Sequence, residues 1–152
     1  MHLGTVGIMV TIAAVAKVLG GFGSAARHAA VSELGLARAV RDGLPFATLE
    51  RLIADDIVDE REVEAHFIPR RTYYARRLKA TLSREQSDLV VRLARTQATA
   101  DEVFGDRTQA HLWLRERNGA LGGQTPLALL DTEEGGRLVE AVLGRIAHGI
   151  VE

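Results

Sequence analysis

The sequence predicts an all-α protein of about seven or eight helices, with an N-terminal helix-turn-helix part and a C-terminal helical domain. Three observations lead to this prediction. Apolar residues recur at helical spacing through most of the chain. Helix-capping pairs occur at Asp59 with Glu62 and at Ser83 with Gln86. Proline and glycine separate the helical segments, as they do where helices begin and end.

Composition restricts the classes of function. The 152 residues suit one domain or two small ones, and a core of this size needs no disulfide or metal to stabilise it. The absence of cysteine excludes a thiol nucleophile and a disulfide framework, and it fits a reducing cytosol. The net charge is only −1, so any nucleic-acid interpretation depends on local asymmetry of charge. We expect a cytoplasmic protein.

The sequence contains no motif for catalysis or for a metal or cofactor. The histidines form no i,i+4 pair and have no acid at ligand spacing. The segment around Gly20 and Gly21 lacks the lysine and hydroxyl of a phosphate loop, and no nucleophile elbow is present. We therefore expect no metal, no cofactor and no enzymatic activity. The histidines concerned are His2, His28, His66, His111 and His148.

Residues 3–22 form an almost unbroken apolar run. A signal peptide or membrane helix is rejected, because no positive charge precedes the run and Lys17 lies within it. We expect a helix from Val10 to Leu19. A helix that is apolar on all sides suits a place with partners on both sides, so two roles stay open: a helix of the core, or the contact between two copies of the chain. We favour a homodimer formed through this N-terminal part.

Residues 32–60 predict two further helices and a turn. Ser32 caps the first, Glu33 to Asp42, and Gly43 ends it. Pro45 begins the second. The acidic stretch from Asp55 to Glu60 is expected to be a solvated turn. The residues expected on the buried face of the second helix are Phe46, Leu49, Leu52 and Ile53.

A helix, a tight turn and a basic helix follow, which is the order of a helix-turn-helix. We expect the first helix over Glu60 to Phe67, a turn at Ile68-Pro69, and the second helix over Arg70 to Lys79. On a helical wheel of the second helix, the residues expected to face inward are Tyr74, Ala75 and Leu78. The residues expected on the other side, facing the major groove or the phosphates of DNA, are Arg70, Tyr73, Arg76 and Arg77. If Tyr73 instead faces inward, Arg71 and Arg76 become the outward pair. An ordinary solvated face is the alternative to DNA contact.

Ser83 and Gln86 predict the start of a long helix from Arg84 to about Ala100. Its buried stripe is expected to be Leu89, Val90, Leu93 and Ala94. Asp101 or Glu102 is expected to restart the chain into a short turn that Gly105 closes. A helix from Thr108 to Glu116 is then expected around Leu112 and Trp113. Trp113 is interpreted as a core residue, with contact to a partner as the alternative.

Residues 118–149 form the most specific stretch, a glycine-containing loop followed by a short helix and a longer one. Gly122 and Gly123 permit positive φ. Thr125 and Pro126 predict the short helix, which ends at about Leu130. Thr132 caps the longer helix, whose apolar residues recur at helical spacing, and Gly149 ends it. These apolar residues are Leu138, Val139, Val142, Leu143 and Ile146.

This stretch resembles the C-terminal toxin-binding domain of Xre/MbcA/ParS-type antitoxins, the partners of RES-domain toxins in bacterial toxin–antitoxin operons. The resemblance extends back to about Ser83 and weakens from Leu36 to Leu82. In that family the N-terminal part is an Xre-type DNA-binding domain. The residues that carry the resemblance are Asn118, Ala120 to Gly123, Thr125 to Leu127, Leu130, Thr132, Gly135 and His148-Gly149.

The resemblance implies an antitoxin that blocks a RES-domain toxin, which consumes NAD or transfers ADP-ribose, and that represses its own operon. We expect a dimerising, DNA-binding domain over residues 1–81, a toxin-binding domain over residues 82–152, and no contact with a membrane. The first alternative is a stand-alone helix-turn-helix regulator with a helical dimerisation domain. A small helical enzyme is the weakest hypothesis.

Two sets of site residues follow from the resemblance. The residues expected to contact operator DNA are Arg70, Arg71, Thr72, Tyr73, Arg76 and Arg77. Those expected to contact the toxin are Trp113, Asn118, Leu121, Gly122, Gly123, Arg145, His148, Ile150, Val151 and Glu152. The last three form a tail that is expected to enter the dinucleotide pocket of the toxin, where its carboxylates would pair with arginines.

Overall fold

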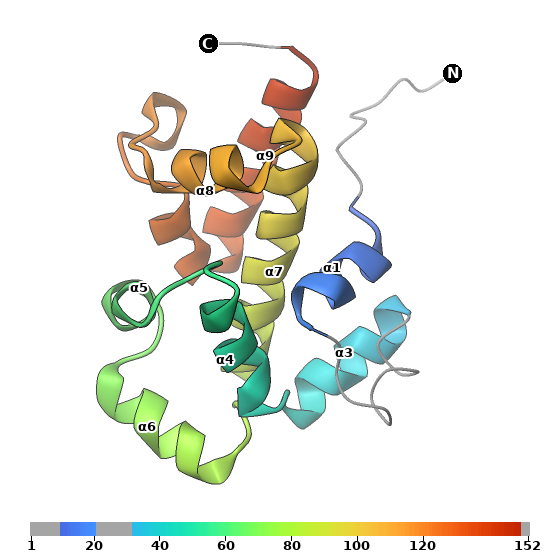
Figure 1. Cartoon of the computed structure of the whole chain (residues 1–152), viewed down its shortest axis with the longest axis vertical. Coiled ribbons are helices and arrows are strands. Elements are labelled where there is room, and N and C mark those ends of the chain that lie inside the picture. The colour runs from blue at the N-terminus through green and yellow to red at the C-terminus, as the bar shows by residue number, and fades with distance from the viewer. Residues whose placement is uncertain (1–9, 21–31, 150–152) are drawn as a thin grey trace. The chain divides into compact units, whose positions relative to one another are not determined.

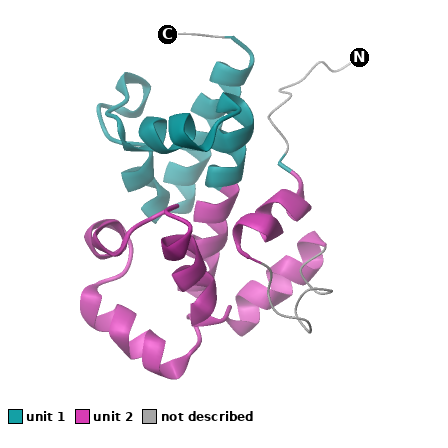
Figure 2. Ribbon diagram, in the orientation of Figure 1, with its two compact units in different colours: residues 1–10, 96–152 teal, residues 11–95 magenta. Residues whose placement is uncertain are grey.

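The computed structural model describes residues 10–20 and 32–149, and its elements are helices, which confirms the all-α prediction (Figure 1). In this part of the chain, the extended pairings outside helices are two isolated bridges, Pro45 with Thr81 and Asn118 with Gln124. Contacts divide the chain into unit 1, residues 1–10 and 96–152, and unit 2, residues 11–95 (Figure 2). The division expected between residues 81 and 82 stays a prediction.

Unit 2 contains the first five described helices and the beginning of α7. The sequence predicted the starts of most of them: the Ser32 side chain caps α3, and Asp59 and Glu62 form the expected capping box of α5 at 2.8 and 3.0 Å. Gly43, with φ of 93°, ends α3. The helices are α1 (Ile12–Val18), α3 (Glu33–Asp42), α4 (Phe46–Ala54), α5 (Glu60–His66), α6 (Arg70–Lys79) and α7 (Arg84–Phe104).

The core of unit 2 is formed by side chains from all six of these helices and from the turns between them. Val15 and Leu19 are buried, so one side of α1 belongs to this core; contact with a second copy stays a prediction. The solvated turn expected from Asp55 to Glu60 is partly wrong. Ile57 and Val58 are 3% and 1% exposed, because the turn folds back through a bond from the Ile57 N–H to the Leu52 carbonyl at 3.0 Å.

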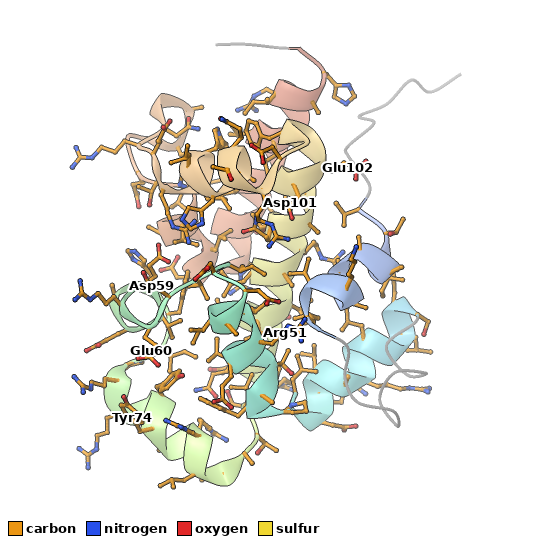
Figure 3. All side chains as sticks on the ribbon, viewed as in Figure 1. Arg51, Asp59, Glu60, Tyr74, Asp101 and Glu102 are labelled. Atoms are coloured by element: carbon orange, nitrogen blue, oxygen red, sulfur yellow. The ribbon has the colours of Figure 1, made fainter. Side chains whose placement is uncertain are left out.

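Unit 1 contains the end of α7 and the elements that follow it. The break expected at Asp101 or Glu102 is wrong, because α7 continues through both residues to Phe104 (Figure 3). The Asp101 carboxylate accepts a bond from Gln97 at 2.8 Å and pairs with Arg107, so it is not a cap. Asp106 caps the next helix instead. The elements are α8 (Arg107–Arg115), the 3-10 turns η1 (Gly119–Leu121) and η2 (Leu127–Asp131), and α9 (Glu133–Ala147).

In unit 1, α9 lies beside the C-terminal part of α7. The Glu140 carboxylate accepts bonds from the buried hydroxyls of Thr96 and Thr99, at 3.5 and 3.4 Å. Two apolar residues expected inside are exposed, Leu112 by 49% and Leu138 by 55%. The buried sides of α8 and α9 are formed instead by Ala110, Leu114, Val139, Val142 and Leu143. Among the described residues, no helix is long and apolar enough to cross a membrane.

Candidate functional sites

The first candidate site is formed by α5 and α6 and the turn between them. The turn consists of Phe67, Ile68 and Pro69, one residue more than expected, which is the length that a helix-turn-helix uses. Ile68 is buried, and its N–H donates to the Val63 carbonyl at 2.8 Å. The turn therefore fixes where α6 begins.

The orientation of α6 differs from the predicted wheel. Tyr73 is its buried residue, 8% exposed, whereas Tyr74 is 42% and Leu78 90% exposed. The Tyr73 ring meets the ring of Phe46 in α4 edge-on, with centroids 5.0 Å apart, and this contact takes Tyr73 into the core of unit 2. Burial raises the pKa of the Tyr73 phenol, and the carboxylates of Glu60 and Glu50 raise it further. The prediction that Tyr74, Ala75 and Leu78 face inward is wrong.

With Tyr73 inside, the basic residues of α6 fall into two groups. Arg70, Arg71 and Arg77 are exposed, whereas Thr72 and Arg76 are half-buried. Of the alternative outward pair, Arg71 is exposed and Arg76 is half-buried. Among the described residues, none of the basic side chains of α6 forms an ion pair, and residues 69–79 include no acid. This helix thus presents an unneutralised positive surface, which suits a polyanion.

The second candidate site is the loop from Asn118 to Gln124 in unit 1. The Asn118 side chain accepts a bond from the Ala120 N–H at 3.0 Å, and its carbonyl accepts from the N–H groups of Leu121 and Gly123. The Asn118 N–H donates to the Gln124 carbonyl at 3.0 Å. One residue thus closes both ends of the loop. The shape of the loop follows from backbone hydrogen bonds.

The glycines of this region serve two different purposes. Gly122 and Gly123 have φ of 67° and 81°, and a Cβ on either would meet no atom within 4 Å. They are exposed, so the loop presents bare backbone. A Cβ on Gly135, at the start of α9, would instead fall on the Leu129 carbonyl oxygen of η2. This packing role was not predicted from the sequence, where its one signal is a glycine three residues after the cap Thr132.

The residues expected to contact a toxin lie in several environments. Leu121 is buried in the loop, and Asn118 is half-buried beside the exposed Gly122 and Gly123. Trp113 is half-buried, with its ring 5.8 Å from that of Phe104. At the end of α9, Arg145 is half-buried and His148 exposed; η1 packs against this helix. Ile150, Val151 and Glu152 lie outside the described residues. The described part of the chain holds no group of three or more possible metal ligands.

Comparison with known families places a domain on each candidate site. The family model for the antitoxin Xre-like helix-turn-helix domain matches residues 35–95, which include α5 and α6. The model for the antitoxin Xre/MbcA/ParS C-terminal toxin-binding domain matches residues 99–149, which include the Asn118 loop and α9.

Individual relatives agree with these domain matches. A protein of Pseudomonas putida named antitoxin Xre is 32% identical over 116 residues, which cover 72% of this chain and 69% of the relative. Antitoxin Xre of Photorhabdus laumondii is 37% identical over 81 residues, 51% of this chain, and that of Yersinia enterocolitica 33% identical over 85 residues, 55% of this chain. The matched stretches span 55% and 57% of these two relatives.

Proposed function

The chain belongs to the Xre antitoxin family, and from that premise we propose that it is the antitoxin of a bacterial toxin–antitoxin pair. In this proposal it binds and blocks a RES-domain toxin, which consumes NAD or transfers ADP-ribose, and it represses its own operon. It acts in the cytoplasm as a homodimer formed through the N-terminal part. It needs no cofactor and inhibits an enzyme rather than acting as one.

The DNA-binding half of the proposal is supported by α6. Its exposed arginines, Arg70, Arg71 and Arg77, have no acidic partner among the described residues, so they are available to phosphates. Thr72 and Arg76 are half-buried and lie on the side of α6 that carries Tyr73. Tyr73 acts through its packing, because its buried ring sets the rotation of α6.

The observation that carries the toxin-binding half is the Asn118 loop, a hydrogen-bonded loop with exposed backbone inside the matched toxin-binding domain. Exposed glycines allow a partner to approach the main chain closely. Because the loop is already held by hydrogen bonds, binding would order little additional chain, which lowers its entropic cost. We propose that this loop and the last turn of α9, with Arg145 and His148, contact the toxin.

We further propose that the tail blocks the toxin's active site. Ile150 and Val151 are apolar, and the side chain of Glu152 supplies a carboxylate, which match a pocket lined by phosphate-binding arginines. A protein shortened to Gly149 should bind operator DNA normally but protect poorly. Losing two enclosed aliphatics and a charge pair should weaken inhibition by about 2 to 5 kcal/mol.

The proposal predicts a gene for a RES-domain toxin beside that of this chain, and the experiment co-expresses the two proteins. Growth rescue, co-purification and NAD consumption by the purified pair are measured for the full chain and for the chain ending at Gly149. Arg137→Ala is the matched control, because Arg137 is exposed on α9 and pairs with Glu133 and Glu134. Failure of the full chain to bind the toxin would refute the proposal. Full protection by the shortened chain would assign the block to the loop or to α9.

A further inference from the structure

We propose that Tyr74 and Leu78 determine the sequence specificity of α6 by contacting thymine methyl groups in the major groove, an inference that rests on the proposed DNA binding. Neither residue was expected on the outward face. Their position follows from the burial of Tyr73, which fixes the rotation of the helix.

The outward face of α6 follows from its periodicity. At about 100° per residue, the side opposite the buried Tyr73 and the half-buried Thr72 and Arg76 carries residues 71, 74 and 78. Two of these three are large and apolar or aromatic. Leu78 is 90% exposed, the most exposed of the large apolar residues described. An apolar strip in the middle of a basic surface offers an apolar contact to a polyanionic partner.

Tyr74 is held in place before any ligand binds. Its ring stands edge-on to that of Tyr73, with centroids 5.3 Å apart, and Tyr73 in turn meets Phe46 of the core. The guanidinium of Arg70 lies 5.8 Å from the centroid of the Tyr74 ring. A row of aromatic contacts thus runs from the core to the surface. A side chain held in this way loses little freedom on binding, which favours it as a determinant of specificity.

The chemistry of the Tyr74 and Leu78 side chains favours a base edge over a phosphate. A hollow of about 260 Å³ between α5 and α6 is bordered by Tyr74, by the acids Glu60 and Glu64, and by Arg61 and Arg70. Figure 3 labels Glu60 on α5 and Tyr74 on α6. The hollow therefore carries charges of both signs, and the ring of Tyr74 is the aromatic surface at its edge. In the major groove the thymine methyl is the apolar group of the base edges, and it matches an aromatic or leucine side chain.

The spacing of the two residues gives the proposal a testable geometry. Residues four apart in a helix are separated by about 6 Å along its axis, and base pairs are separated by about 3.4 Å. Tyr74 and Leu78 should therefore contact thymines about two base pairs apart. Tyr74 lies in the middle of α6 and Leu78 in its last turn, so Tyr74 is the nearer of the two to the N-terminal end, which contacts base edges in helix-turn-helix proteins.

The test replaces thymine by deoxyuridine, which removes only the methyl group. The probe is a duplex from the region upstream of the protein's own gene, within which a footprint defines the bound site. Each thymine of that site is replaced in turn, and the Kd is measured for the unaltered chain, Tyr74→Ala and Leu78→Ala. Loss of a contacted methyl should weaken binding of the unaltered chain by about fourfold. Tyr74→Ala should abolish that penalty at one thymine and Leu78→Ala at another.

Two variants serve as controls. Tyr74→Phe keeps the ring and should keep the methyl penalty, whereas Leu138→Ala removes an exposed leucine of α9 and should leave DNA binding unchanged. Methyl penalties that persist in full in both Tyr74→Ala and Leu78→Ala would overturn the proposal. So would a change in oligomeric mass or toxin affinity in Leu78→Ala with unchanged DNA affinity, because the strip would then contact protein.

Salt dependence separates this inference from the proposed function. Tyr74→Ala and Leu78→Ala remove no charge, so log Kd should keep its dependence on log salt. If the unaltered chain shows no specific binding to the upstream duplex, the DNA-binding half of the proposed function fails and the inference fails with it. If specific binding and its salt dependence are present but no methyl penalty depends on Tyr74 or Leu78, only the inference fails.

Discussion

The helix α6 and the Asn118 loop present opposite kinds of surface. α6 exposes side chains on a backbone whose position is fixed by one buried residue, Tyr73. The loop exposes backbone at Gly122 and Gly123, and its shape follows from hydrogen bonds to Asn118. Substitutions on the outward face of α6 should therefore change binding without changing the fold. Substitutions in the loop region should change shape first and binding as a result.

The basic residues of α6 and of α9 also differ in whether acidic side chains neutralise them. The basic residues of α6 have no acidic partner among the described residues, so their charge acts outward. In α9, Arg137 pairs with Glu133 at 3.0 Å and with Glu134 at 2.8 Å, in the first turn of the helix. Glu133 and Glu134 also stabilise α9, because negative charge is favourable near the N-terminus of a helix. Long-range attraction of a polyanion should therefore depend on α6 and be insensitive to Arg137.

The largest effect is expected from Gly135→Ala. The new Cβ would strike the Leu129 carbonyl oxygen, which belongs to the backbone and cannot move aside as a side chain could. The free energy of unfolding should fall by about 3 kcal/mol, and toxin binding should be lost. Chemical denaturation and co-purification with the toxin measure the two effects.

Gly144→Ala is the matched control, because Gly144 lies in the same helix and its Cβ would meet nothing within 4 Å. There the substitution should increase the free energy of unfolding by about 0.5 to 1 kcal/mol through helix propensity. Equal stability of the two alanine variants would contradict the tight packing of α9 against η2.

The next effect is expected from the double substitution Arg71→Ala and Arg77→Ala in α6. Removing two phosphate contacts should reduce the slope of log Kd against log salt by about 1.8 for double-stranded DNA. The free energy of unfolding should change little, because both side chains are exposed. Titration of an upstream duplex at several salt concentrations measures the slope, with Arg137→Ala as the control. An unchanged slope in the double variant would remove α6 from the DNA contact.

The starts of the helices could be predicted from the sequence, whereas the rotation of α6 could not. Capping boxes and helix ends depend on residues within one turn, so the starts of α3, α5, α7 and α9 were predicted correctly. The rotation of α6 depends on contact between Tyr73 and Phe46, which belongs to another helix. Local apolar spacing gave the wrong face for that reason, since an exposed leucine and an exposed tyrosine resemble buried ones in a sequence.

The same limit applies to unit 1. The acid at Asp101 was expected to cap a new helix, but its partners Gln97 and Arg107 satisfy it while α7 continues. The loop was predicted from its glycines, yet the role of Gly135 depends on where η2 places the Leu129 carbonyl. The candidate toxin contacts came from family resemblance alone, and those at residues 150–152 lie outside the described part of the chain.

A smaller effect is expected from Asn118→Ala, which removes the side-chain acceptor of the Ala120 N–H. Loss of such a cap should lower the free energy of unfolding by about 1 kcal/mol and loosen the loop. Toxin affinity should fall in parallel, whereas affinity for DNA should not. Asn118→Asp keeps the acceptor and should keep toxin binding. Toxin affinity that is equal in the alanine variant and the unaltered chain would show that the preformed shape of the loop is not required.

The smallest effect concerns Tyr73 and the pH dependence of stability. Burial, with added repulsion from Glu60 and Glu50, raises the pKa of the Tyr73 phenol above its ordinary 10.0, although Arg77 acts in the opposite direction. The folded chain therefore holds this proton more tightly than the unfolded chain does. The stabilisation is fully present below about pH 10 and is lost as the pH rises through the raised pKa.

In Tyr73→Phe no phenol has to stay protonated, so the free energy of unfolding should fall less between neutral pH and about pH 11 than in the unaltered chain. Denaturant unfolding at a series of pH values measures this difference. Tyr74→Phe, which removes the neighbouring exposed phenol, is the control and should follow the unaltered chain. If the free energy of unfolding of Tyr73→Phe falls as steeply, groups other than the Tyr73 phenol govern alkaline unfolding. The hydroxyl of Tyr73 would then be as accessible to water as the exposed side of α6.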